Sequence, residues 1–168
     1  MLSGILSKES CAGCRFCCSF RRASLWEVPV FTKENTEAIR KNPKLDETVL
    51  IPLSENADYA RYDLSSHYQT DDSEEEAKCP YLSETGCVLS KEEKPWDCSI
   101  WPLRVMRKED GELVIALTPT CPAINRLEFE TVRQYVNENL REELLDYALK
   151  HPLLVKEYRV DFPIIDPQ

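Results

Sequence analysis

One stretch near the start of the chain decides how the rest is interpreted: Cys11-Ala-Gly-Cys14-Arg-Phe-Cys17-Cys18. Two residues between successive cysteines allow a tight turn to aim both sulfur atoms at one point, as in zinc knuckles and iron–sulfur loops. Three cysteines at this spacing, from residue 11 to residue 17, are typical of a ferredoxin run. The pattern therefore predicts a metal site with thiolate ligands.

Further cysteines along the chain extend this candidate site. A ferredoxin run takes its last ligand from a Cys-Pro pair, and the chain has two such pairs, Cys79-Pro80 and Cys121-Pro122. His67 and His151 are expected to be surface residues rather than ligands. The predicted metal ligands are all eight cysteines: Cys11, Cys14, Cys17, Cys18, Cys79, Cys87, Cys98 and Cys121.

The setting of the cysteines argues for metal rather than disulfides. Eight of 168 residues are cysteine, and the first residues lack the basic segment and long apolar run of an export signal. Disulfide frameworks belong mainly to short secreted chains, so we expect a cytoplasmic protein with metal-bound thiolates.

The charge balance excludes two classes of partner. The chain has 21 Lys and Arg against 30 Asp and Glu, a formal net charge of −9. Nucleic acids and anionic membranes reward positive charge, so neither is expected as a partner. No run approaches the roughly 18 apolar residues that span a bilayer. The charge does not exclude a protein partner, which the sequence does not identify.

The identity of the metal is a narrower question. Zinc with four thiolates and an oxidised 4Fe–4S cube with four thiolates carry the same net charge, and soft thiolate ligands suit both. The triple run followed by distant Cys-Pro pairs favours a 4Fe–4S cluster, and zinc remains the alternative.

The adjacent pair Cys17-Cys18 raises the question of one site or two. Neighbouring side chains point about 180° apart on a strand and about 100° apart on a helix, so we expect the pair to serve different sites. The first would take Cys11, Cys14 and Cys17 with one Cys-Pro cysteine. The second would take Cys18, Cys87 and Cys98 with the other; a single site with a spare thiol is the alternative.

Hydrophobic patterning predicts a small α+β single domain, with short strands and turns around a cysteine-ligated metal centre and flanking helices. The domain would cover 1–168, with a cysteine-rich core over 11–123 and a C-terminal helical part over 124–168. The acidic stretch over 65–78 is expected to be a solvated loop, and the tail from Pro152 is expected to lie over the core. The predicted elements are an extended edge piece over 26–31, a helix over 33–41 capped by Thr32, strands over 48–53 and 60–64, a tight turn over 83–86, a hairpin of 103–107 with 113–117 through Asp110-Gly111, and a helix over 128–150 broken near 137–139.

The order of the cysteines and their neighbours resembles the YkgJ-type CxxCxxCC cysteine-cluster family, whose members are described as zinc- or iron-chelating domains. The similarity covers residues 11 to about 123 and includes Gly86-Cys87 and Lys94-Pro-Trp-Asp-Cys98-Ser-Ile-Trp-Pro102-Leu. Lys94 departs from the family, which usually has Arg at this position. Lysine keeps the positive charge but lacks the planar guanidinium group of arginine. Flagellin lysine N-methylases carry a similar cysteine domain.

Three functions follow as hypotheses. The leading one is a metal-binding protein that holds an iron–sulfur cluster or zinc, in a process that the sequence does not identify. The resemblance to the flagellin methylases implies a second, a protein-lysine N-methyltransferase-like enzyme. The third is a zinc-stapled interaction module. In each case we expect nearby arginines to neutralise the charge of the metal centre. These are Arg15, Arg21, Arg22 and Arg104.

Overall fold

Short helices and strands alternate along residues 13–165, the residues that the computed structural model describes, and together they form an α+β fold. The chain divides between Ser99 and Ile100 into two units, here called the cysteine unit (residues 13–99) and the hairpin unit (residues 100–165). This division lies upstream of the boundary that the sequence predicts after residue 123, and the single domain over 1–168 stays a prediction. Within residues 13–165, no helix is both long enough and apolar enough to cross a membrane.

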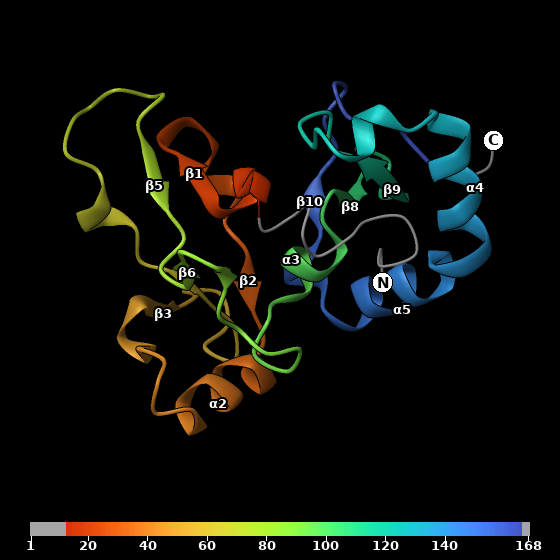
Figure 1. The fold of residues 1–168 in the computed structure, drawn as a ribbon. Helices are drawn as coiled ribbons and strands as arrows, with labels where there is room; N and C mark the ends of the chain where they lie inside the picture. The colour runs from red at the N-terminus through yellow and green to blue at the C-terminus, as the bar shows by residue number, and fades with distance from the viewer. Residues whose placement is uncertain (1–12, 166–168) are drawn as a thin grey trace. The chain divides into compact units, whose positions relative to one another are not determined.

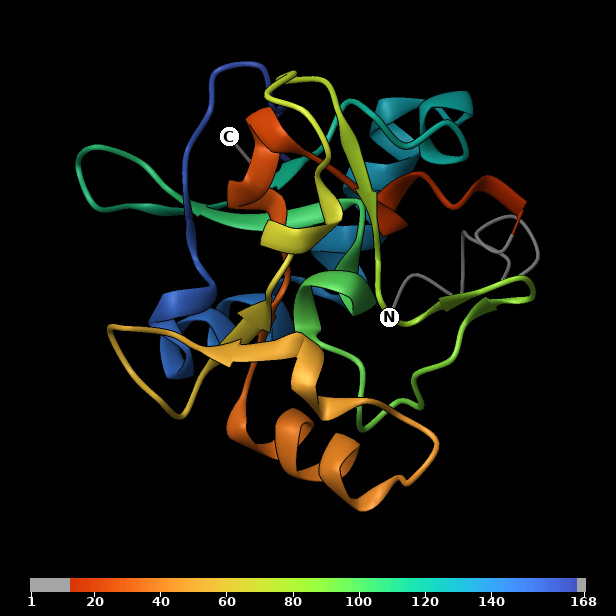
Figure 2. The same ribbon diagram turned by 90° about the vertical axis from the view of Figure 1, so that its left-hand side faces the viewer.

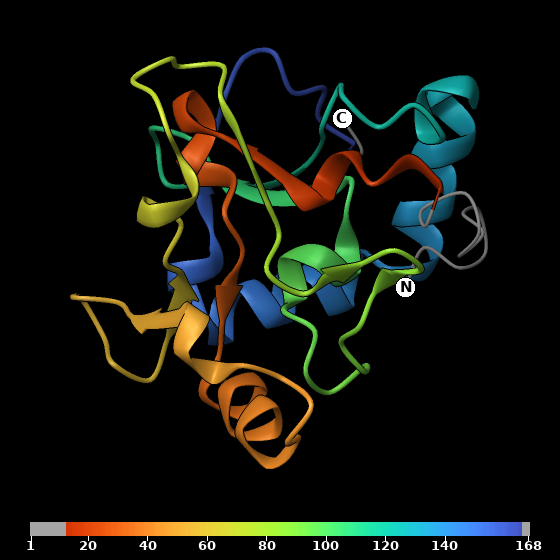
Figure 3. The ribbon, with the colours of Figure 1, turned by 60° about the vertical axis from the view of Figure 1, so that its left-hand side comes forward.

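The cysteine unit contains a three-stranded antiparallel sheet in the order β2-β4-β3. A helix, α2, follows β2 directly and lies beside the sheet (Figure 3). Thr32 caps this helix by accepting a hydrogen bond from the Asn35 N–H, and the Asn35 side chain accepts from the Thr32 N–H. The predicted cap, helix and both strands are confirmed, and β2 is an edge strand as Pro29 predicts. The predicted extended piece over 26–31 is shorter than expected, because its first two residues belong to a 3-10 turn. The bounds are β2 Val30–Phe31, α2 Lys33–Lys41, β3 Leu50–Pro52 and β4 Ala60–Tyr62.

A second, two-stranded ladder joins the cysteine run to the middle of the chain. Strand β1 (Ser19–Arg21) pairs antiparallel with β5 (Glu76–Lys78), with Ser19 opposite Lys78 (Figure 1). Phe20 and Ala77 face each other in this ladder and are both buried. The two strands therefore share one inner face, which fixes their register.

The remaining elements of the cysteine unit are short. Strands β6 and β7 form a tight hairpin, confirming the predicted turn, and Gly86 has φ 112°, a value that side chains with a Cβ rarely adopt (Figure 2). The bounds are η2 Phe16–Cys18, η3 Arg22–Glu27, η4 Glu47–Val49, η5 Ser65–His67, β6 Leu82–Ser83, β7 Gly86–Cys87 and α3 Trp96–Ile100.

The acidic stretch over 65–78 is more ordered than the sequence predicts, because its carboxylates have local partners. The Glu75 carboxylate accepts hydrogen bonds from the backbone N–H groups of Gln69 and Thr70 and lies 3.5 Å from the Arg22 guanidinium. Arg21 pairs with Glu74 and Glu76 at 3.4 and 3.5 Å. The expectation of a solvated loop is therefore wrong for the part that forms β5.

The hairpin unit is built on β8 (Leu103–Arg107) and β9 (Leu113–Leu117), which pair over their full length as predicted. Their connection passes through Gly111 at φ 91°, and the Asp110 carboxylate accepts from the Glu112 N–H. The predicted helix over 128–150 is present as two helices that meet at Leu140, next to the predicted break. The bounds are η6 Ile124–Arg126, α4 Phe129–Asn139 and α5 Arg141–Lys150.

Apolar side chains of α5 and the C-terminal segment cover the β8–β9 pair. Helix α5 contacts both strands (Figure 1). Its Leu144 side chain is fully buried. After η7 (Pro152–Leu154), strand β10 (Lys156–Glu157) pairs parallel with β8, and the Ile165 N–H donates to the Ile115 carbonyl at 2.8 Å. This confirms that the tail lies over the core of its own unit.

Acid should weaken the cysteine unit through Glu75. Hydrogen bonds from the backbone of Gln69 and Thr70 lower the pKa of Glu75 from 4.5 to about 2, so its contribution to stability is present above pH 4.5 and lost as the pH falls towards 2. Glu75→Gln should therefore lower the melting temperature at neutral pH. The difference in melting temperature between this variant and the parent protein should disappear as the pH falls from 4.5 to about 2. Melting curves recorded by circular dichroism across this range measure the effect.

Glu74→Gln is the matched control, because Glu74 is an exposed neighbour that contacts Arg21 at the surface. Surface ion pairs contribute little to stability, so this variant should melt close to the parent protein at every pH. Equal losses in the two variants would contradict the role given to the Glu75 hydrogen bonds.

Candidate metal centre

Most of the predicted ligands belong to one unit. Cys11 lies outside the described residues, and Cys121 is a buried residue of the hairpin unit. The other six lie in the cysteine unit, and all seven described cysteines are free thiols. In the cysteine unit they are Cys14 before η2, Cys17 and Cys18 on η2, Cys79 just after β5, Cys87 on β7 and Cys98 on α3.

The β1–β5 ladder brings two sequence-distant cysteines together. Beyond the last pair of the ladder, Ser19 with Lys78, the Cys79 N–H donates to the Cys18 carbonyl at 2.8 Å. The two residues are 61 positions apart (79 − 18), yet the backbone hydrogen bond holds them side by side. The ladder thus places the first Cys-Pro cysteine at the end of the cysteine run.

Cys18 lies at the centre of the gathered thiols. A hydrogen bond with the Cys17 thiol, then burial, raises the pKa of Cys18 far above its ordinary value. The negative charge that Cys17, Cys79 and Cys98 would carry as thiolates raises it further. Cys79 also interacts with Cys17, and Cys98 interacts with both Cys79 and Cys17, so all four cysteines share one electrostatic neighbourhood.

The contact between Cys17 and Cys18 corrects one expectation. Their side chains were expected to point apart, but the two thiols hydrogen-bond to each other. Both residues lie on η2, a 3-10 turn that ends where the backbone becomes extended at Ser19 (φ −125°, ψ 136°). The geometric reason for assigning the pair to two separate sites is thereby removed.

Cys98 reaches the cluster because the segment before it is tied to α2. The Asn35 side chain donates to the carbonyls of Glu92 and Lys94 at 2.9 and 3.2 Å. The buried Glu93 carboxylate accepts from the Asn42 side chain at 2.8 Å and from the Ser90 N–H at 2.6 Å. This network fixes the loop that leads into α3.

The environment of Cys98 favours its neutral form when no cation is near. Burial raises the pKa of the Cys98 thiol well above its ordinary value, and the charges of Asp97, Cys79 and Cys17 raise it further. Asp97 is itself buried, and its carboxylate accepts a hydrogen bond from the Val30 N–H at 3.2 Å. A bound cation would offset the concentration of negative charge that several thiolates create here.

Cys79 differs from the other thiols because hydrogen-bond donors surround its sulfur. Burial raises the pKa of Cys79, whereas hydrogen bonds from the Tyr62 hydroxyl and the Tyr81 backbone N–H lower it. The distance between the Cys79 Sγ and the Tyr62 oxygen is 3.3 Å. These donors stabilise a thiolate, the form of cysteine that binds metals.

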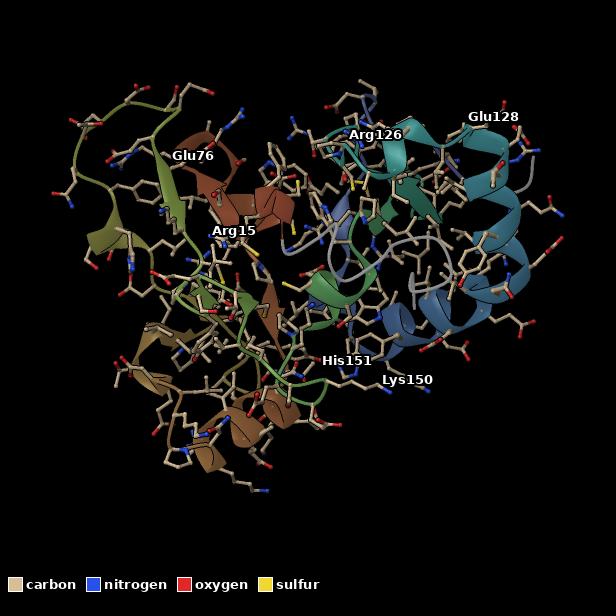
Figure 4. All side chains as sticks on the ribbon, in the orientation of Figure 1. Arg15, Glu76, Arg126, Glu128, Lys150 and His151 are labelled. Atoms are coloured by element: carbon tan, nitrogen blue, oxygen red, sulfur yellow. The ribbon has the colours of Figure 1, made fainter. Side chains whose placement is uncertain are left out.

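Cys87 and Arg15 lie at the exposed side of the group. Cys87 is opposite Leu82 in the β6–β7 hairpin, and its charge contributes to raising the pKa of Cys79. Arg15 has φ 55°, and its guanidinium donates to the Glu84 carbonyl in the same hairpin (Figure 4). The cysteine run is thus tied to the segment that carries Cys87.

Two of the expected charge-neutralising arginines have other partners. Arg21 and Arg22 form ion pairs with Glu74, Glu75 and Glu76, and Figure 4 shows Glu76 on β5. The prediction that they neutralise the centre is therefore wrong. Arg104, in the hairpin unit, is buried with its guanidinium 4.8 Å from the centre of the Trp101 ring.

Both histidines were predicted to lie at the surface, and the structure confirms this for His67 alone. His67 is exposed on η5. His151 follows α5 in the hairpin unit, half-buried, with its ring 4.5 Å from the Tyr147 ring (Figure 4).

The gathered thiols do not yet form a set of ligands at bonding distance. Over residues 13–165, no three Cys, His, Asp or Glu side chains are arranged so that they could hold one ion as they stand. The chemistry of the donors nevertheless fits a soft metal centre, because Cys17, Cys18, Cys79 and Cys98 all offer sulfur. A hydrogen bond with Cys17 and burial raise the pKa of Cys18, and burial raises the pKa values of Cys79 and Cys98, so a bound cation would be needed to hold these three as thiolates.

Sequence reasoning missed Tyr62 as a residue of this site. The strand over 60–64 was predicted, but alternation along a strand does not reveal what a buried side chain contacts. Only the pairing of β4 between β2 and β3 and the position of Cys79 place the hydroxyl against sulfur.

Comparison with protein-family models, curated proteins and solved structures gives no match for this chain. The similarity to the YkgJ-type family therefore continues to depend on the cysteine pattern, and the analogy to the flagellin methylases depends on the same pattern.

The metal-free protein should show a definite order of thiol reactivity. At about pH 8.5, iodoacetamide should label the exposed Cys14 and Cys87 before the other described cysteines. Only the thiolate reacts, and the pKa values of Cys18, Cys79 and Cys98 are raised. Peptide mass spectrometry at timed intervals gives the rate for each residue. Labelling in urea should abolish the order, and a Cys98 rate equal to that of Cys14 in the folded protein would contradict the placement of Cys98.

Proposed function

We propose that this protein binds a metal centre through its cysteine cluster, with a 4Fe–4S cluster favoured over a zinc ion. The observation that carries the proposal is that Cys17, Cys18, Cys79 and Cys98 come from three separate segments and lie within electrostatic reach of one another. Three segments that converge on thiols, rather than on apolar side chains, are typical of a ligand set.

The candidate ligands are ranked by how the fold holds them. Cys18 and Cys79 are joined by a backbone hydrogen bond, and Cys98 is fixed by the network around Glu93. Cys14 and Cys87 are exposed. A small movement of the loop before η2 or of the β6–β7 hairpin would add one of these sulfur atoms to the ligand set or remove it. Cys11 and Cys121 stay ligands predicted from the sequence alone.

The free thiols fit a protein of a reducing compartment such as the cytoplasm. The surroundings of the cluster support an iron–sulfur centre. The sulfur of Cys79 accepts a backbone N–H and is flanked by buried aromatic rings, and hydrogen bonds and low exposure are the features that tune the potential of such centres. When bound, the cluster would supply one-electron chemistry. The protein's own residues would bind it, hold its thiolates and limit the access of water.

Metal analysis of protein prepared without oxygen tests the proposal. Iron with acid-labile sulfide and broad visible absorption would support the cluster, and colourless protein with stoichiometric zinc would show a zinc-stapled module instead. Wild-type protein that holds neither metal after anaerobic reconstitution would overturn the proposal.

Replacing Cys98 should remove the metal, because Cys98 is the ligand that α3 contributes to the cluster. Cys98→Ser and Cys18→Ser should each lose most of the bound metal, whereas His67→Ala and His151→Ala should retain it. Elemental analysis of the four purified variants measures the effect. Equal loss in the cysteine and histidine variants would show that the ligand set is wrong.

Metal removal should also lower thermal stability. A ligand set of thiolates from separate segments is assembled only in the folded chain, so binding free energy adds to the free energy of unfolding. Chelator treatment should then reduce the melting temperature of wild-type protein but leave that of Cys98→Ser unchanged. Metal-free and metal-bound wild-type protein that melt at the same temperature would contradict a structural role.

A further inference from the structure

The hydroxyl group of Tyr62 faces the sulfur of Cys79 inside the cysteine unit. The two atoms are 3.3 Å apart, and the residues are 3% and 9% exposed respectively. In the neutral state the Cys79 thiol donates to the Tyr62 oxygen. When Cys79 is a thiolate, the direction reverses and the Tyr62 O–H donates to sulfur, which is why Tyr62 lowers the pKa of Cys79.

The fold gives the Tyr62 ring little freedom to turn away. Tyr62 lies on β4, the central strand of the β2-β4-β3 sheet. Three aromatic rings surround it, with centroid distances of 5.9 Å to Phe20, 5.1 Å to Phe31 and 5.8 Å to Tyr81. A ring packed in this way keeps its hydroxyl directed at one partner.

A buried tyrosine hydroxyl is a costly group to place in a core unless it has a hydrogen-bond partner. The neighbouring Tyr81 shows the contrast, because its hydroxyl donates to the Asp46 carbonyl at 2.8 Å. Both tyrosines belong to the same aromatic cluster, yet only the Tyr62 hydroxyl is hydrogen-bonded to a candidate ligand among the residues that the structure describes.

We propose that Tyr62 is a positioning residue of the metal centre, which donates its hydroxyl proton in a hydrogen bond to the metal-bound sulfur of Cys79. This inference rests on the proposed function. The hydrogen bond fixes the direction of the sulfur lone pairs and withdraws electron density from the thiolate. Because the hydrogen bond favours the thiolate over the thiol, a centre held through this sulfur is bound more tightly. If the centre contains iron and sulfide, the withdrawal of electron density makes it easier to reduce.

The test compares Tyr62→Phe with Tyr81→Phe. The second variant removes a hydroxyl that contacts the Asp46 carbonyl and keeps the backbone N–H of residue 81 that donates to the Cys79 sulfur. Each protein is loaded with Co²⁺ without oxygen and titrated with a chelator. Tyr62→Phe should bind Co²⁺ about 10–100-fold more weakly than wild type, the usual cost of losing an outer hydrogen bond to a ligand. Its sulfur-to-cobalt charge-transfer band should move to lower energy, because a thiolate without the hydrogen bond is a better electron donor. Tyr81→Phe should match wild type in both.

A double mutant separates action through sulfur from a packing effect. In the background of Cys79→Ser, adding Tyr62→Phe should produce no further change in affinity or in the charge-transfer band. Wild-type affinity and an unshifted band in Tyr62→Phe, or an equal shift in Tyr81→Phe, would overturn the role of Tyr62 while leaving metal binding intact. Failure of the wild-type protein itself to bind Co²⁺, zinc or iron would overturn both proposals together.

Discussion

The candidate site depends on a single backbone hydrogen bond, from the Cys79 N–H to the Cys18 carbonyl at 2.8 Å. It continues the β1–β5 ladder by one step, and the register of that ladder is fixed by the buried pair Phe20 and Ala77. A slip of one residue would turn both inner side chains outward and carry Cys79 away from the cysteine run. The meeting of Cys18 with Cys79 is therefore a consequence of sheet register.

The other thiols are added to this pair by polar contacts rather than by a large apolar core. Asn35 and Glu93 hold the loop that leads to Cys98, and Arg15 holds the cysteine run against the hairpin that carries Cys87. These contacts bring together the segments that carry the sulfur atoms, and the thiols are crowded as a result. The cost is visible in the raised pKa of Cys18, since crowded thiols resist ionisation.

Tyr62 and Asp97 show how the apolar core and the cluster share residues. The Tyr62 ring packs with Phe31 and Tyr81 as a core residue, while its hydroxyl contacts the Cys79 sulfur. Asp97 is buried beside Cys98 and accepts a hydrogen bond from β2. A single substitution at either position would change stability and ligand chemistry together. Comparing Tyr62 with Tyr81 separates the two effects, because one hydroxyl contacts sulfur and the other contacts a carbonyl.

The sequence by itself determined the local structure: the Thr32 cap and its helix, the β8–β9 hairpin with its turn through Gly111, and the break between α4 and α5. These follow from residues near one another in the chain, whose periodicity and turn chemistry are legible without a fold. Tertiary structure alone decided which cysteines meet, that Arg21 and Arg22 pair with glutamates and that a tyrosine hydroxyl reaches sulfur. Contacts between residues tens of positions apart depend on strand register and on burial, and neither is encoded in the spacing of cysteines.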